Sequence, residues 1–115
     1  MVNYSQVNRT SQAELDRSFH ALAHPVRRAI VGRLAGGPAT VHEASRGSGV
    51  SKPAVTRHLH VLEEAGIIDR VIRGRTHVLT LRSDPLAEAA GWIEGHRRLW
   101  ERKLDIIEAY LKERQ

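Results

Sequence analysis

The feature that most constrains the fold of this chain is a helix-forming stretch that ends in a glycine and continues directly into a basic, partly alternating segment. Ser51 can cap the helix, Pro53 is tolerated in its first turn, and Gly66 can end it in a left-handed conformation. Residues 67–82 follow, with Arg73-Gly74-Arg75 where a hairpin turn is expected. The sequence therefore predicts a helix followed by a two-stranded antiparallel ribbon.

The predicted helix has two distinct faces. Its apolar residues recur at helical spacing and should face a core: Val55, Leu59 and Leu62. The remaining surface carries side chains that form hydrogen bonds with base edges or phosphates: Lys52, Thr56, Arg57 and His60. An ordinary amphipathic surface helix shows the same division, so the flanking sequence has to decide between the two interpretations.

The upstream flank favours a helix-turn-helix unit. Thr40-Val-His-Glu43 is a capping-box pattern that opens a short helix, and Gly47-Ser-Gly-Val50 is a glycine-bearing turn into Ser51. Two short helices joined in this way and followed by a hairpin predict a winged helix-turn-helix, which is a DNA-binding arrangement.

The rest of the chain is predicted to be helical. A capping box at Ser11 opens a first helix, His24-Pro25 separates it from a second that contains Val26, Ile30 and Leu34, and Asp84-Pro85 caps the last helix, over about 84–112. We expect a mainly α fold of about five helices with a small β-hairpin wing. Residues 1–10 are interpreted as a flexible N-terminal arm and 11–115 as a single domain.

Basic charge is concentrated on the predicted DNA-binding unit. Residues 24–82 carry ten Lys or Arg against four Asp or Glu, whereas residues 83–115 carry six against seven, within a chain of formal net charge +5. Fifteen of the 18 basic residues are arginine, whose forked guanidinium suits phosphate and guanine. This distribution indicates double-stranded DNA as the partner.

The last predicted helix carries more apolar surface than one small domain covers. Its main stripe alternates spacings of four and three and is interrupted by Arg97: Leu86, Ala90, Ile93, Trp100, Leu104, Ile107 and Leu111. A second stripe runs beside it: Trp92, Leu99 and Ile106. We therefore expect packing on the first helix and on a second copy of the chain, which forms a homodimer. The predicted dimer contacts are Leu15, Phe19, Leu22, Ile93, Trp100, Leu104, Ile107 and Leu111.

The segments Ala21-Leu-Ala-His-Pro-Val-Arg-Arg-Ala-Ile30 and Ser51–Gly66 together resemble the ArsR family of bacterial winged-helix repressors. The resemblance covers roughly residues 12–111. It implies dimerisation through the first and last helices and repression by binding of a palindromic operator. It also implies that many relatives release DNA when they sense a metal ion or an oxidant.

This chain departs from the metal-sensing members of that family. It has no cysteine, Val41-His-Glu-Ala44 stands where relatives place a cysteine pair, and the last helix has only His96. We therefore expect no metal and no cofactor. Two other sites stay open as alternatives for a ligand-responsive repressor: a histidine site across the dimer, from His20 with His24 or His96 with Glu94, and a small-molecule pocket lined by Trp92 and Trp100.

The candidate DNA contacts divide into two groups. Thr56, Arg57 and His60 are expected to read base edges, whereas Lys52, Arg73 and Arg75 are expected to bind phosphates or enter the minor groove. Ser51 and Pro53, at the start of the same helix, complete the predicted site.

Other classes of protein find little support in the sequence. It contains no Ser/His/Asp, paired-carboxylate or glycine-rich phosphate-loop arrangement, so we do not expect an enzyme. No apolar run approaches the roughly 18 residues of a membrane span and no signal-peptide core is present, so we expect a cytoplasmic protein without a membrane partner. A sequence-blind architectural DNA-binding protein remains an alternative, as do activation in place of repression and an inducer of unidentified chemistry.

Overall fold

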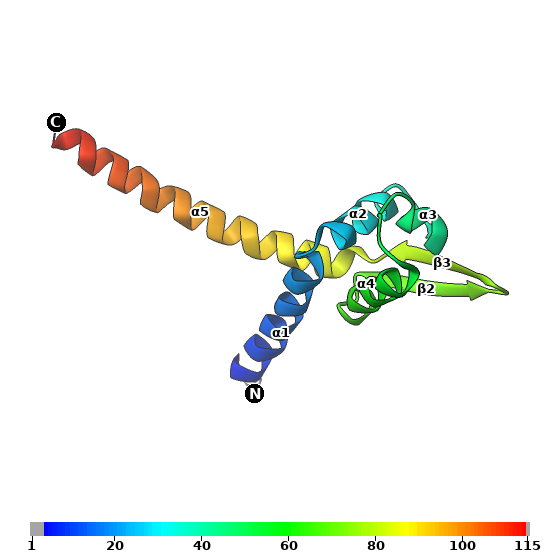
Figure 1. Cartoon of the computed structure of the whole chain (residues 1–115). Coiled ribbons are helices and arrows are strands. Elements are labelled where there is room, and N and C mark those ends of the chain that lie inside the picture. Colours follow the sequence, from blue (N-terminus) through cyan, green and yellow to red (C-terminus); the bar gives the residue numbers. More distant parts are fainter. Residues whose placement is uncertain (1–3, 115) are drawn as a thin grey trace.

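The computed structural model describes residues 4–114, with side chains from residue 12 onward. The elements in chain order are α1 (Tyr4–Leu22), α2 (Pro25–Leu34), β1 (Ala39–Thr40), α3 (Val41–Ser45), α4 (Lys52–Glu64), β2 (Ile68–Arg73), β3 (Thr76–Leu81) and α5 (Ser83–Glu113). This order is that of a winged helix-turn-helix, so the predicted fold class is confirmed (Figure 1).

The helix-turn-helix forms for the local reasons that the sequence indicates. Thr40 Oγ1 accepts from the Glu43 amide and Glu43 Oε1 accepts from the Thr40 amide, both at 3.1 Å, which completes the capping box of α3. Ser51 caps α4 by accepting from the Ala54 amide at 3.3 Å. Gly66, with φ of +71°, closes the helix in a Schellman motif, in which the Ile67 amide donates to the Leu62 carbonyl at 3.0 Å.

The wing is a two-stranded antiparallel hairpin, with one additional short strand that the sequence did not reveal. Strand order is β1-β3-β2, and β1 pairs with β3 through Ala39 opposite Leu79 and Thr40 opposite Val78. Arg73 faces Thr76 at the tip, and Gly74 takes φ of +63° in the two-residue turn. A glycine is favoured at the first position of a type II′ hairpin turn for this reason.

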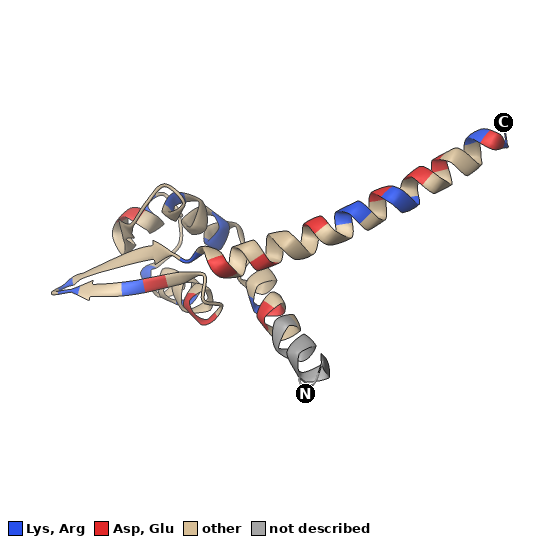
Figure 2. Cartoon of the chain, turned by 180° about the vertical axis from the view of Figure 1, so that it is seen from behind, with Lys and Arg blue, Asp and Glu red and all other residues tan. Residues whose placement is uncertain are grey.

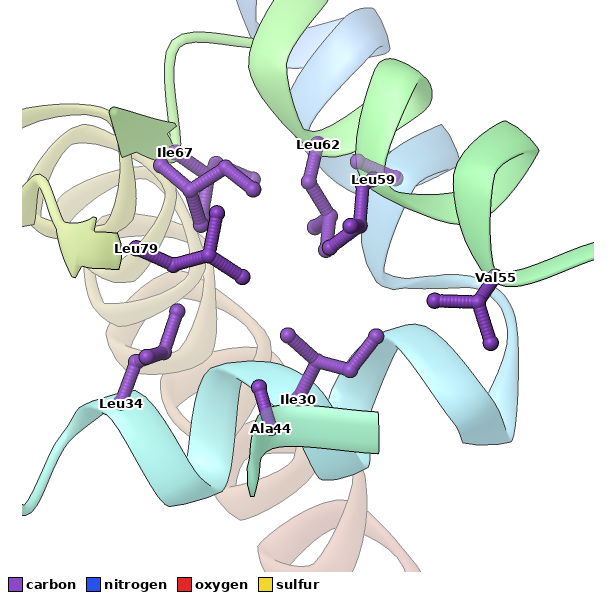
Figure 3. Close-up of a cluster of buried hydrophobic side chains, with 10 residues drawn as sticks. Ile30, Leu34, Ala44, Val55, Leu59, Leu62, Ile67 and Leu79 are labelled. Carbon is purple, nitrogen blue, oxygen red and sulfur yellow. The ribbon is translucent and has the colours of Figure 1, made fainter. Parts of the chain in front are cut away.

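The core lies between α2, α4 and the base of the wing (Figure 3). Five of the residues predicted to be buried on α4 and α2 are confirmed: Val55, Leu59, Leu62, Ile30 and Leu34. Val26 is only partly buried against this core. Ile67, Ile68 and Leu79 close the core from the sheet side. This packing fixes α4 with its polar surface outward and holds the wing beside it.

Helix α5 projects well beyond this core (Figure 1). The radius of gyration is 19.2 Å, whereas a compact domain of this length has about 13 Å. Near its start α5 crosses α1, where the Phe19 and Trp92 rings meet edge to face with centroids 5.7 Å apart. Most of the helix therefore has no cover from its own chain. None of the described helices has the length and apolar content needed to cross a membrane.

Two predicted helix starts are wrong. Helix α1 begins at Tyr4 and runs through Ser11, so Ser11 is not its N-cap. Helix α5 begins at Ser83, its N-cap is Arg82 without a side-chain hydrogen bond, and Asp84 lies in the first turn. The arm predicted for residues 1–10 stays a prediction for residues 1–3, which lie outside the described part of the chain, whereas residues 4–10 belong to α1.

Candidate nucleic-acid interface

The polar surface of α4 presents the predicted contact residues to solvent. All of them are exposed: Ser51, Lys52, Pro53, Thr56, Arg57 and His60. Pro53, Arg57 and His60 lie on the side of the helix opposite the buried Val55 and Leu59, because these positions differ by about half a turn. The helix therefore offers a continuous outward face on which hydrogen-bonding side chains follow one another.

The side chains on this face differ in how freely they can reach a ligand. Thr56 Oγ1 donates to the Lys52 carbonyl at 3.1 Å. His60 Nε2 lies 3.0 Å from Glu64 Oε1, one turn further along. Among the described residues, Arg57 has no hydrogen bond or ion pair within the chain, so its guanidinium is available for bidentate contact with a base or phosphate.

The wing is fixed at its base and free at its tip. Arg70 Nη2 donates to Glu63 Oε1 of α4 at 2.5 Å, and Nη1 lies 3.1 Å from His77 Nδ1 on the neighbouring strand. Beyond this contact the strand leaves the body, with Ile72 62% exposed. The tip carries Arg73 and Arg75 in solvent, and Figure 2 shows basic residues at the end of the hairpin. The wing thus carries positive charge away from the core.

Helix α3 faces both the start of α4 and the wing. A hollow of about 350 Å³ separates α3 from Lys52 and Thr56 of α4, and a second of about 450 Å³ separates it from Arg70 and Arg75 of the wing. His42 lines both. The structure therefore brings the first half of α4 and the base of the wing to one basic surface, with His42 between them.

The sequence interpretation missed three residues of this surface. His42 was considered only within a capping box and at the place of a cysteine pair in metal-sensing relatives, Arg70 only for its charge and as part of residues 67–82, and His77 only as part of that segment. An exposed histidine in the first turn of the first helix of a helix-turn-helix is a usable signal, because that turn lies next to the DNA backbone. The Arg70–His77 contact is harder to predict from the sequence, because the two residues become neighbours only once the hairpin strands have paired.

The predicted dimer residues fall into two groups. Leu15, Phe19 and Leu22 of α1 are partly buried within the chain. The predicted dimer residues on α5 are all exposed: Ile93, Trp100, Leu104, Ile107 and Leu111. Their exposed fractions range from 46% for Ile93 to 63% for Leu104. Burial of both apolar stripes within one chain is therefore excluded, and α5 presents a long uncovered apolar face.

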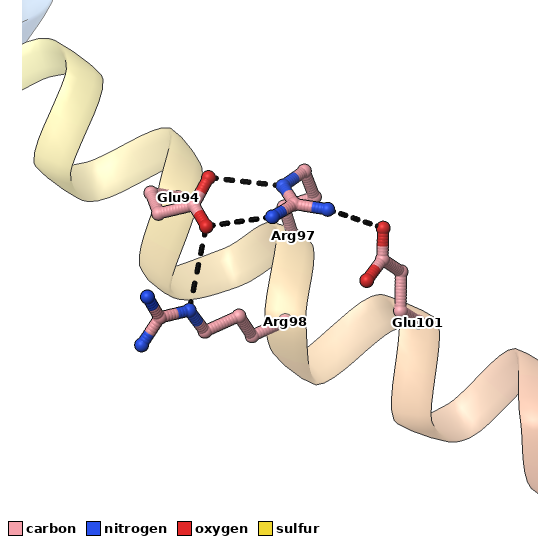
Figure 4. Close-up of polar contacts among 4 residues, drawn as sticks. All are labelled: Glu94, Arg97, Arg98 and Glu101. Carbon is pink, nitrogen blue, oxygen red and sulfur yellow. Dashed lines mark hydrogen bonds and ion pairs between the residues drawn. The ribbon is translucent and has the colours of Figure 1, made fainter.

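A charged network interrupts this apolar face at Arg97 (Figure 4). The Arg97 guanidinium donates to both carboxylate oxygens of Glu94, at 2.9 and 2.7 Å, and to Glu101 at 2.5 Å. Arg98 also donates to Glu94. The hydrogen bonds from Arg97 lower the pKa of Glu94 to about 2, so this carboxylate is charged at any physiological pH.

Two of the three histidines considered for a metal site, His24 and His96, are already engaged by the backbone. His24 Nδ1 accepts from the Val26 amide at 3.1 Å, and His96 Nδ1 donates to the Trp92 carbonyl at 2.9 Å. Within residues 12–114, no three His, Asp or Glu side chains lie together as a metal site would require. The His96 ring stacks on Trp92 with centroids 4.1 Å apart.

Comparison with known proteins places these features in a regulator family. A family model described as a helix-turn-helix domain matches residues 22–71. The chain is 42% identical over 89 residues to the HTH-type transcriptional regulator Rv2034 of Mycobacterium tuberculosis, and the aligned region covers 77% of this chain and 80% of that protein. It is 28% identical over 79 residues to the transcriptional repressor SdpR of Bacillus subtilis, and this aligned region covers 69% of this chain and 88% of the relative.

Solved structures show the same architecture. The crystal structure of the ArsR family transcriptional regulator RHA00566 superposes with a TM-score of 0.72 at 34% identity, covering 88% of this chain and 97% of the other. The similarity therefore spans most of both chains.

Proposed function

Since this chain belongs to the ArsR-like family of winged helix-turn-helix transcriptional regulators, we propose that it acts as a homodimeric repressor that recognises a palindromic operator. Regulators of this kind bind DNA and are not enzymes. The proposal includes neither a metal nor a cofactor, and it places the protein in the cytoplasm, where bacterial DNA is found.

The observation that carries this proposal is the exposed polar face of α4 beside an arginine-tipped wing. Thr56, Arg57 and His60 contact base edges in the major groove, and Ser51, Lys52 and Pro53 lie against the adjoining backbone. Arg73 and Arg75 contact phosphates or enter the minor groove beside it. The basic surface between the two elements supports this docking.

The dimer is proposed from the uncovered face of α5. A helix that exposes both stripes along most of its length needs a partner, and an isologous pairing with a second copy covers the same residues on both chains. Phe19, whose ring meets Trp92, extends this surface onto α1, whereas Leu22 packs against the core of its own chain. Two α4 helices related by the twofold axis then meet two half-sites about one helical turn apart.

The base-reading assignment of Arg57 predicts a sequence-dependent loss. Arg57→Ala is expected to weaken operator binding by about 1–3 kcal/mol and to relax the preference at one position in each half-site, because a bidentate contact is removed. Competition binding against point-substituted operators measures both effects. Arg102→Ala, on the polar side of α5, removes the same charge and should leave the preference unchanged. Equal operator affinity of Arg57→Ala and wild type would refute the assignment.

The wing assignment predicts a sequence-independent loss. Arg75→Ala is expected to weaken binding to operator and to unrelated DNA by the same factor and to reduce the slope of log K against log salt by about one. Titrations at several salt concentrations on both duplexes measure the slope. A loss confined to the operator would show that Arg75 reads sequence.

A further inference from the structure

The corner between α1 and α2 contains a buried arginine that contacts three helices. Arg27 is 8% exposed, and its guanidinium donates to two carbonyls at the end of α1, through Nε to Ala21 at 2.7 Å and through Nη2 to His20 at 3.0 Å. Nη1 lies 3.0 Å from His58 Nδ1 on α4. Arg27 therefore ties the end of α1, which contributes to the proposed dimer contacts, to the helix that reads DNA.

The two histidines at this corner both use Nδ1 as an acceptor. A guanidinium can only donate, so His58 Nδ1 accepts from Arg27. His24 Nδ1 accepts from the Val26 amide and thereby caps α2. The two rings lie against each other with centroids 4.3 Å apart. Each ring is held in the tautomer whose proton lies on Nε2, and addition of a second proton at Nδ1 breaks the hydrogen bond.

The titratable and charged groups that face His58 are all basic. They come from His24 and Arg27 at the start of α2 and from Arg57 on its own helix, and α1 contributes only backbone carbonyls to Arg27. Among the described residues, no carboxylate forms a hydrogen bond or ion pair with His24, Arg27 or His58. Desolvation first, and then these neighbouring charges, lower the pKa of His58 from its usual 6.5.

We propose that His58 is a positioning residue for the reading helix, which it holds through its contact with Arg27 and His24. We call this contact the histidine joint. Protonation of the joint breaks the contact, frees α4 to move and weakens DNA binding in mildly acidic conditions. This inference rests on the proposed function and adds to it a regulatory input, the proton. His58 follows Arg57, the residue assigned to base reading, directly along α4.

The direction of the effect follows from the folded pKa. A histidine whose pKa is depressed in the folded state contributes stability above its unfolded pKa, and this contribution is lost as the pH falls from about 6.5 through the folded value. Protonation of a histidine that touches DNA directly would have the opposite consequence, because it adds positive charge next to the phosphates. The two kinds of histidine therefore give pH effects of opposite sign, which separates the joint from general electrostatics.

The test compares variants at His58 on one duplex at pH 7.5 and 5.5 at constant ionic strength. His58→Asn places Oδ1 near the position of Nδ1, so it keeps an acceptor for Arg27 without a titrating group, whereas His58→Leu removes the acceptor. At pH 7.5 we expect His58→Asn to bind like wild type and His58→Leu to bind about threefold or more weakly. At pH 5.5 we expect wild type to bind about tenfold more weakly than His58→Asn, a factor equivalent to about 1.4 kcal/mol.

The control variants keep the result decisive. His20→Asn removes an exposed histidine of α1 that is outside the proposed DNA contacts and keeps the backbone carbonyl that Arg27 uses, so it should bind with the same pH dependence as wild type. If His58→Asn does not fold, as judged by circular dichroism, His24→Asn serves instead, because asparagine is a good N-cap. A wild-type to His58→Asn affinity ratio that is the same at both pH values would overturn the inference. Absence of wild-type binding to any selected duplex at pH 7.5 would instead overturn the proposed function.

Discussion

Replacement of Ile107 by glutamate is expected to convert the protein to a monomer at micromolar concentration and to weaken operator binding by about 100-fold or more. Ile107 lies in the middle of the uncovered face of α5 and is 53% exposed in the single chain. In a twofold dimer the substitution places two carboxylates in an apolar contact, where neither has a partner. Loss of the dimer removes the gain from binding two linked half-sites, which is typically 10²–10⁴-fold.

A matched control lies two residues away. Ala109→Glu introduces the same charge on the opposite side of α5, which is exposed and carries no apolar stripe. It should stay dimeric in sedimentation equilibrium and bind the operator like wild type. If Ile107→Glu sediments as wild type does, the apolar face of α5 is not the dimer contact and the proposed pairing is wrong.

Replacement of Leu62 by alanine is expected to lower the free energy of unfolding by about 2–5 kcal/mol. Leu62 of α4 is fully buried against α2 and the base of the wing (Figure 3). Truncation of its side chain therefore leaves a cavity that the surrounding residues fill only in part. Urea unfolding followed by far-ultraviolet circular dichroism measures the change, at fixed protein concentration because the proposed dimer would contribute to stability.

The matched control for this variant is Ile72→Ala. Ile72 lies on the wing with 62% of its surface exposed, so its truncation should change the free energy of unfolding by less than about 0.5 kcal/mol. A Leu62→Ala loss as small as that of Ile72→Ala would contradict the assignment of Leu62 to the core.

Local signals in the sequence account for most of the helix-turn-helix. The capping box at Thr40, the cap at Ser51 and the left-handed Gly66 each act within a few residues, so their patterns can be read directly and are confirmed. The buried face of α4 follows from helical periodicity in the same way. The charged side chains of the outer face are equally visible, but no sequence pattern tells which of them touches DNA.

The elements that the sequence did not reveal depend on distant contacts. Strand β1 has two residues, too few for any periodicity, and exists because it pairs with Val78 and Leu79. Arg27 is separated from His58 by 31 positions, so its role in joining three helices is absent from local patterns. The start of α1 was misplaced because a capping-box pattern at Ser11 also fits a helix interior.

Selection of random duplex DNA by the purified protein at near-physiological salt tests the central claim most directly. A dimeric, site-specific regulator predicts recovery of an inverted repeat whose halves are centred about one helical turn apart, with enrichment lost in Arg57→Ala. Retention of DNA that is salt-sensitive but carries no enriched motif would contradict site-specific recognition and favour an architectural role, since phosphate contacts alone supply such binding.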